Sequence, residues 1–395
     1  MQKLKFFPAL LVAYETVTYL SNDAYLPALP TIIVDFSTTT QLAQLSLTLW
    51  LLGGCLIQPL LGPICDRFGR RPVLLIGGIF FILSTLLCGI TQQISIFLIA
   101  RFIQGAAVPT LAIAGYAAIH ELLDHDNAIR TLAWMSSVTV FAPSLGPLLG
   151  AVLLYLLNWR DIFIALGGLA ILFLSLLALK MPETLSPLSI QPLLIKRVGQ
   201  TYWAILKNMD FMLKVSLLCC ILCAMITWIC VSPLLLIQHF HYSLIGYGMV
   251  QMYVFGSFII GTYFVHCLLT RIITNKLLLV GGLLIGSAGL IIILSVIINS
   301  LAGFILAMML TGAGTGIWFP IFNRFAVESS KEPMAMRMTV ISTLVSVCAV
   351  LSSIIIEIIP INLLSIGMII LFCNLLAILL FSLEYKCISN ISIES

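Results

Sequence analysis

Three charged residues lie inside apolar stretches near the start of the chain. Glu15 is some ten residues into the first stretch, Asp23 follows eight residues later, and Arg101 is about six residues into the fourth. Charge near the centre of a bilayer costs roughly 2.5 kcal/mol or more, so such residues usually face a cavity and have a partner. On a helix, Asp23 would lie about 12 Å outward of Glu15 and only some 80° around the axis. Both carboxylates can therefore face one cavity.

Asp23 and Arg101 are predicted at similar depths, which makes them candidate ion-pair partners. A buried carboxylate whose partner can be withdrawn takes up and releases a proton near neutral pH. A proton-coupled carrier needs this property. The alternative is that Asp23 and Arg101 are interfacial residues whose side chains reach the water. An interfacial position is a poorer explanation for Glu15, because Glu15 lies too deep for its side chain to reach the water.

The segment 62–72 is the most specific pattern in the sequence, and it is predicted as a tight cytoplasmic turn. It combines two glycines, one carboxylate and three guanidinium groups: Gly62, Asp66, Arg67, Gly69, Arg70 and Arg71. Such a turn can fix membrane topology, and it can form breakable ion pairs to a helix end that moves during gating. A role in topology alone would predict the basic residues but neither the glycines nor the carboxylate.

The composition indicates that lipid surrounds most of these elements. Of 395 residues, 61% are hydrophobic and only 9% are charged, whereas soluble domains keep roughly a quarter of their residues charged. Apolar runs of this length without alternation predict helices and exclude a β-barrel. Twelve membrane-spanning helices are predicted at 6–27, 41–62, 72–91, 95–118, 131–157, 162–180, 213–238, 243–270, 277–299, 302–325, 338–359 and 361–383.

Basic residues predict the orientation. With a cytoplasmic N-terminus, Arg160 is the only Lys or Arg in an outer loop. The inner loops and their flanks hold Arg67, Arg70, Arg71, Arg130, Lys180, Lys196, Arg197, Lys207, Lys214, Arg271, Lys276, Lys331 and Arg337. Both termini are therefore expected in the cytoplasm. The long polar stretch 181–212 divides the chain into two six-helix halves, 1–180 and 213–395, as in many secondary transporters. No cleavable signal peptide is recognised at the N-terminus.

Several motifs resemble those of the major facilitator superfamily. The 62–72 turn resembles its signature loop, residues 101–105 its helix-4 motif, and residues 141–150 its antiporter motif, with Ala151 where many members have a second glycine. Residues 23–30 resemble the Bcr/CflA drug-resistance group, and residues 14–23 and 115–121 are similar to drug/proton antiporters. The resemblance covers the whole chain and is densest over 10–160. It implies the major facilitator fold, an all-α integral membrane protein of twelve helices in two halves.

The resemblance also implies roles for individual residues. Glu15 and Asp23 would be the protonatable carboxylates and Arg101 their coupling partner. Pro143, Gly146, Pro147 and Gly150 would let helices pack closely and bend. Substrate would meet Glu15, Tyr19, Asn22, Asp23 and Tyr116, together with Trp228 and Pro233 of the segment that resembles the helix-7 cavity region. His120 stands where these antiporters carry a glutamine, Arg324 and Glu357 match charged positions more loosely, and Glu357 is equally well explained as an interfacial residue.

These observations predict a drug:proton antiporter that exports lipophilic cationic and neutral compounds by alternating access. The partners would be protons, small lipophilic substrates and lipid, with no nucleic acid, and the protein would act as a monomer in a bacterial inner membrane. No cofactor or metal is expected: there is no phosphate-binding loop, and most of the eleven cysteines lie in apolar runs without metal-ligand spacing. The alternatives are an exporter of one metabolite, such as a siderophore, and more remotely a membrane enzyme or a non-transporting sensor.

Overall fold

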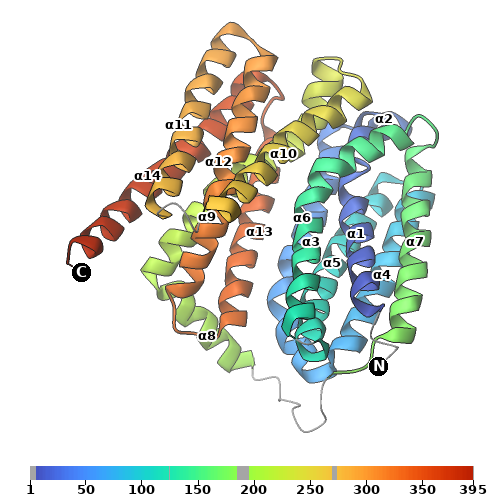
Figure 1. Cartoon of the computed structure of the whole chain (residues 1–395). Coiled ribbons are helices and arrows are strands. Elements are labelled where there is room, and N and C mark those ends of the chain that lie inside the picture. Colours follow the sequence, from blue (N-terminus) through green and yellow to red (C-terminus); the bar gives the residue numbers. More distant parts are fainter. Residues whose placement is uncertain (1–5, 124, 185–194, 269–273, 395) are drawn as a thin grey trace. The chain divides into compact units, whose positions relative to one another are not determined.

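The structure, a computed structural model, describes residues 6–123, 125–184, 195–268 and 274–394. Over these residues it consists of helices and their connections (Figure 1). The long helices are α1 (Phe7–Asp23), α3 (Thr40–Phe68), α4 (Arg70–Ile90), α5 (Ile94–Leu122), α6 (His125–Leu153), α7 (Trp159–Lys180), α9 (Met209–Pro233), α10 (Leu244–Leu268), α11 (Thr274–Ile298), α12 (Leu301–Glu328), α13 (Met334–Ile358) and α14 (Leu363–Glu394). Short helices are η2 (Leu26–Ala28), α2 (Leu29–Asp35) and α8 (Ile195–Lys207), and a π-helical turn, η4 (Leu234–His239), extends α9.

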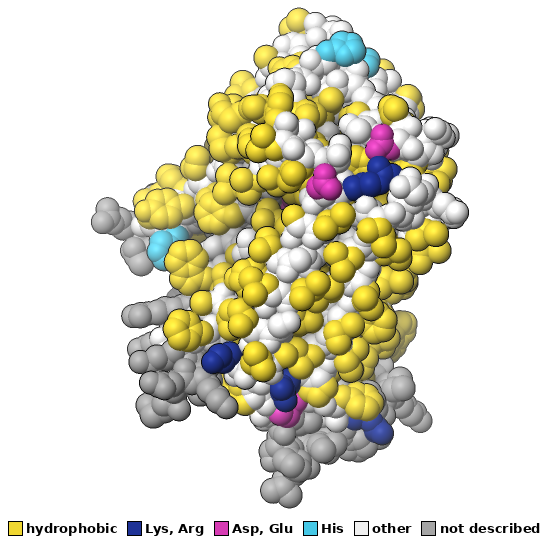
Figure 2. All heavy atoms as spheres, turned by 90° about the vertical axis from the view of Figure 1, so that its right-hand side faces the viewer, with side chains coloured by type: hydrophobic (Ala, Val, Ile, Leu, Met, Phe, Trp, Pro, Cys, Tyr) yellow, Lys and Arg dark blue, Asp and Glu magenta, His cyan; other side chains and the backbone are white. Residues whose placement is uncertain are grey.

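Each of the twelve predicted spans corresponds to one long helix in the described part of the chain. Ten of these helices are long and apolar enough to cross a membrane. α1 has 17 residues, and α6 has a shorter apolar stretch at Ser137–Leu153. Figure 2 shows one face of the molecule, on which hydrophobic side chains cover a broad area and the few visible charged side chains lie in an upper and a lower group. The fold class predicted from the sequence is therefore confirmed.

Several boundaries differ from the sequence prediction, and three of the differences change the assignment of a segment. The first helix ends at Asp23, and Pro27 and Pro30 lie in the first turns of the short helices η2 and α2, which follow it. The predicted tight turn at 62–72 is wrong in its extent. The helix α3 continues through Pro63 to Phe68, and Gly69 alone separates it from α4. Within the 181–212 connection, Ile195–Lys207 forms the helix α8.

The chain divides into two compact units, residues 1–194 with 241–249, and residues 195–240 with 250–395. In the first unit, α5 packs between α3 and α4, while α1 packs against α6 and α7 (Figure 1). In the second unit, α9 packs against α12, α13 and α14, and Trp318, Phe322 and Phe381 form an aromatic cluster in its core. The charged residues singled out in the first four spans all lie in the first unit.

Glycines set the distance at which α3 and α5 cross. A Cβ atom on Gly105 would lie 1.9 Å from the backbone oxygen of Trp50, and one on Gly53 would lie 2.2 Å from that of Phe102. Without side chains at these positions the two helices approach backbone to backbone, as small residues allow in membrane helices. This crossing fixes α5, and with it Arg101, relative to α3.

Candidate functional site

Arg101 on α5 is the centre of a buried polar network in the first unit. Its side chain is 0% exposed, and its guanidinium donates hydrogen bonds to the side-chain oxygen of Asn22 (2.6 Å), the backbone oxygen of Ser21 (3.5 Å) and the side-chain oxygen of Gln104. Gln104 in turn donates to the hydroxyl of Thr85 (2.7 Å). Buried charges persist in proteins when they are hydrogen-bonded in this way.

Aromatic rings complete the surroundings of this guanidinium. Its central carbon lies 4.4 Å from the ring centroid of Tyr25 and 5.9 Å from that of Trp50. A cation over an aromatic face is attracted by the ring quadrupole, most strongly where water is excluded. Arg101 is therefore held in the apolar interior by neutral partners.

The direct ion pair expected between Asp23 and Arg101 is not formed within the described part of the chain. Instead, Asn22 connects them: its amide nitrogen donates to a carboxylate oxygen of Asp23 (3.3 Å), while its oxygen accepts from Arg101. Successive residues of a helix diverge by about 100°. Asn22 therefore faces Arg101, while Asp23 faces α6, where a Cβ atom on Gly146 would lie 2.6 Å from the Cβ of Asp23.

Glu15 lies eight residues before Asp23 on α1 and is also fully buried, at 0% exposure. One carboxylate oxygen accepts a long hydrogen bond of 3.5 Å from the hydroxyl of Tyr116 on α5. The other oxygen has no hydrogen-bond partner among the described residues. A buried carboxylate with one free oxygen can accept a proton or a hydrogen-bond donor from a ligand.

Glycines of α6 bring this helix against the end of α1. A Cβ atom on Gly150 would lie 1.8 Å from the backbone oxygen of Ala24, next to the position where Gly146 meets Asp23. Pro143 and Pro147 lie inside the same helix. The predicted antiporter motif is therefore the surface of α6 that packs on the residues flanking Asp23.

The 62–72 segment forms an ion-pair cluster between α3 and α4. The Arg70 guanidinium pairs with Asp66 and with Glu121 of α5, both at 3.0 Å. The carboxylate of Glu183 accepts hydrogen bonds from the backbone N–H groups of Arg70 (3.1 Å) and Arg71 (3.2 Å). It thereby caps the N-terminus of α4, where the helix dipole favours negative charge.

The remaining predicted residues are distributed over both units. Tyr19 is half-buried on α1, and His120 is exposed near the end of α5. Trp228 is completely buried within the second unit, and its indole N–H donates to Gln251 (2.7 Å). Pro233 ends α9 where the π-helical turn begins. Arg324 is largely exposed and pairs with Glu328 (2.8 Å), and Glu357 is half-buried on α13.

Several partners were not singled out from the sequence. Gln104 follows Arg101 by three residues, a spacing that places side chains together on a helix, so it could have been identified. Glu183, Thr85 and Tyr25 come from other elements, and only the fold brings them to the site. Among the described residues, no cluster of three or more His, Cys, Asp or Glu could hold a metal ion.

Comparison with known proteins identifies the relatives of this chain. It is 33% identical over 327 residues to the chloramphenicol resistance protein CraA of Acinetobacter baumannii, covering 82% of this chain and 79% of that protein. It is 34% identical over 276 residues to the multidrug transporter MdfA of Escherichia coli, covering 70% and 67%. It is 32% identical over 339 residues to the multidrug resistance protein MdtM of Salmonella typhimurium, covering 83% and 80%.

Solved structures share the fold at low sequence identity. A D-xylose–proton symporter superposes with a TM-score of 0.71 at 16% identity, covering 95% of this chain and 96% of that chain. The human organic anion transporter MFSD10 superposes with a TM-score of 0.67 at 16% identity, covering 94% and 98%. The sequence profile of the Major Facilitator Superfamily matches residues 12–356. The chain is a multi-pass membrane protein that belongs to the major facilitator superfamily.

Proposed function

We propose that this chain is a drug:proton antiporter that exports lipophilic compounds across a bacterial inner membrane. The observation that carries the proposal is the network from Arg101 through Asn22 to Asp23, buried in a membrane-spanning unit. The similarity to transporters named for multidrug export and chloramphenicol resistance supports drugs as the substrate class. Such a protein moves solutes and catalyses no reaction.

In this proposal Asp23 carries the coupled proton. While Arg101 and Asp23 share Asn22, the nearby positive charge favours the carboxylate form of Asp23. A movement of α1 relative to α5 that breaks the hydrogen bond between Arg101 and Asn22 would remove that support. In apolar surroundings the carboxylate would then take up a proton, and return of Arg101 would release it.

Glu15 is proposed to recognise the compound that is exported. Its free carboxylate oxygen lies in a buried environment beside Tyr116, and a lipophilic cation would provide the missing partner. We assign Tyr19 and Asn22 as neighbouring contacts on α1. A proton on Glu15 would remove the attraction, so drug and proton would compete for this carboxylate.

The proposal is tested with purified protein in proteoliposomes under an imposed pH gradient. The native protein should concentrate tetraphenylphosphonium, a lipophilic cation, and chloramphenicol against their gradients. Asp23→Asn should abolish this pH-driven transport while substrate binding in detergent remains measurable. Arg101→Lys keeps the charge but loses the planar fork, so only partial coupling is expected.

Asp35→Asn is the matched control, because Asp35 is an exposed carboxylate that pairs with Arg160 at the end of α2. Undiminished accumulation by Asp23→Asn would rule out coupling through Asp23.

A further inference from the structure

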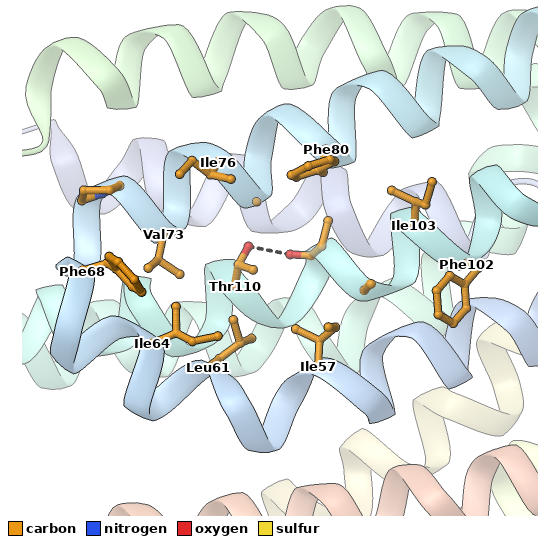
Figure 3. A pocket seen from close by; sticks show the side chains of 14 residues that line it. Ile57, Leu61, Ile64, Phe68, Val73, Ile76, Phe80, Phe102, Ile103 and Thr110 are labelled. Atoms are coloured by element: carbon orange, nitrogen blue, oxygen red, sulfur yellow. Dashed lines mark hydrogen bonds between the residues drawn. The ribbon is translucent and has the colours of Figure 1, made fainter. Parts of the chain in front are cut away.

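A deep groove lies on the first unit, between α3 and α4 and over α5. Its volume is about 590 Å³, and Figure 3 shows side chains from the three helices converging on it. Several of its residues have large exposed fractions: Phe68 is 60% exposed, Ile76 55% and Phe80 53%. The lining residues are Ile57, Leu61, Ile64, Phe68, Pro72, Val73, Ile76, Gly77, Phe80, Phe102, Ile103, Ala106, Ala107 and Thr110.

The groove is lined almost entirely by apolar side chains. Every side chain in it is apolar except that of Thr110, and the Thr110 hydroxyl donates to the backbone oxygen of Ala107 (2.6 Å; Figure 3). A polar ligand would lose its hydration here without gaining hydrogen bonds from the side chains. The groove therefore suits a hydrocarbon.

The length of the groove corresponds to one leaflet of a bilayer. Along α3 it runs from Ile57 to Phe68, which at about 1.5 Å per residue is about 16 Å. The hydrocarbon core of a membrane is about 30 Å thick, so the groove extends from one end of the span to about its middle. α3, α4 and α5 all have the length and hydropathy of membrane spans, so the groove opens where lipid chains lie.

A cation stands at the end of the groove. Arg67 is exposed, and its guanidinium carbon lies 5.6 Å from the ring centroid of Phe68. The other two arginines of this segment are engaged, since Arg70 pairs with Asp66 and Glu121, and Arg71 donates to the backbone oxygen of Ala178 (2.8 Å). Arg67 is thus placed to meet an anion at the level where α3 leaves the membrane.

We propose that this groove is a lipid site that holds one acyl chain of an anionic phospholipid, with the phosphate at Arg67. Depth, apolar lining and terminal charge together match an amphiphile with a negative headgroup. A lipophilic cation, the substrate class proposed above, fits less well, because the guanidinium repels it. The lipid site depends neither on the network around Arg101 nor on the transport proposal.

Lipid retention by the intact protein tests the site. Purified protein is exchanged into phosphatidylglycerol or phosphatidylcholine with identical acyl chains, and the lipid that remains bound is measured by native mass spectrometry. The native protein should prefer phosphatidylglycerol. Arg67→Ala should reduce that preference roughly fivefold, the effect of one basic residue at a membrane surface. Lys276→Ala, which removes another exposed charge near the start of α11, should leave the preference unchanged. An equal loss in both variants would assign the preference to overall surface charge and overturn the site.

Filling the groove tests the acyl chain. Ala106→Phe and, as a second variant at the exposed rim, Ile76→Trp should each lower retention of both lipids. Ile79→Trp is the matched control, because Ile79 is 51% exposed on the same helix and lies outside the lining. Unchanged retention in both groove variants would overturn the proposal. Displacement of phosphatidylglycerol from the native protein by tetraphenylphosphonium, but not from Ile76→Trp, would identify a drug-binding groove and overturn it too.

Discussion

Arg101 donates a hydrogen bond of 2.6 Å to the side-chain oxygen of Asn22, a neutral residue, within the first unit. This bond makes Asn22 the only direct side-chain link from α1 to the guanidinium in the described part of the chain. Because Asn22 also contacts Asp23, two charged groups that the sequence pairs directly are joined through an amide. The amide can keep or lose either bond as α1 and α5 move.

Asn22→Ala should damage coupling as severely as a change of Asp23 itself. It leaves the buried Arg101 with one polar partner fewer, and a lost hydrogen bond to a charged group costs about 1.5–3 kcal/mol. We expect transport driven by a pH gradient to fall at least tenfold. Asn22→Asp should instead retain the protein's stability, because it offers Arg101 a carboxylate. It should also lose coupling, because this direct ion pair would hold Arg101 in place and its positive charge would no longer be withdrawn from Asp23. Accumulation of tetraphenylphosphonium in proteoliposomes measures the first effect, and thermal unfolding in detergent the second. Native-like coupling in both variants would contradict the relay.

The depth of a residue in the membrane can be predicted from its position in an apolar stretch of the sequence. Glu15, Asp23 and Arg101 stand out as charges in apolar runs, and helical rise gives their relative depths. The contact through Asn22 could not be read in this way, since it depends on how far α1 rotates about its own axis. That rotation is set by packing of the end of α1 on the glycines of α6.

In the cluster around Arg70, the sequence allows a local partner to be predicted but not a distant one. Its local partner Asp66 was recognisable at a spacing of four residues, which brings side chains together on a helix. Glu183 lies 113 residues from Arg70, in a segment that reads as an ordinary polar linker. Tertiary structure alone brings this carboxylate to the start of α4.

Gly150→Ala should destabilise the protein, because the added Cβ would lie 1.8 Å from the backbone oxygen of Ala24. Backbone atoms cannot move aside cheaply, and overpacking typically costs about 1–3 kcal/mol. Gly168→Ala is the control, because the structure shows nothing within 4 Å of a Cβ at that exposed position of α7. The midpoint of thermal unfolding in detergent should fall for Gly150→Ala alone. Equal midpoints would mean that α6 and α1 do not approach as closely as described.

Of the two glycines in the 62–72 segment, we expect only Gly69 to be required for the stability of the protein. Gly69 has φ of 96°, and a Cβ there would lie 2.4 Å from a Glu183 oxygen, whereas Gly62 has nothing within 4 Å of a Cβ. Such a conformation costs a residue other than glycine about 1–3 kcal/mol. Gly69→Ala should therefore lower the unfolding midpoint and displace Glu183, while Gly62→Ala should be tolerated. Glu183→Gln separates the two effects, since it removes the capping charge without backbone strain and should cost about 0.3–1 kcal/mol.

The predicted orientation can be checked by labelling with a membrane-impermeant maleimide in a cysteine-free background. A cysteine at Asn158, which is exposed just before α7, should react from outside intact cells. One at Gln191, outside the described residues, should react only after the membrane is permeabilised, because the basic residues of the connection are expected inside. The reverse pattern would invert the topology and place both termini outside.

Glu15→Gln should separate cationic from neutral substrates. The variant keeps the shape of the side chain and an oxygen that can accept from Tyr116, but it removes the negative charge. In a site of low dielectric constant that charge attracts a cation strongly and a neutral molecule hardly at all. Efflux of tetraphenylphosphonium should therefore fall at least tenfold, since a loss of roughly 1.4 kcal/mol of attraction already corresponds to a factor of ten. Efflux of chloramphenicol should change by less than a factor of about three. Tyr116→Phe removes the long hydrogen bond of 3.5 Å but leaves the carboxylate in place, so it should not separate cationic from neutral substrates. If cationic and neutral substrates lose transport equally in Glu15→Gln, Glu15 carries a proton or supports the fold, and recognition of the cation must reside elsewhere.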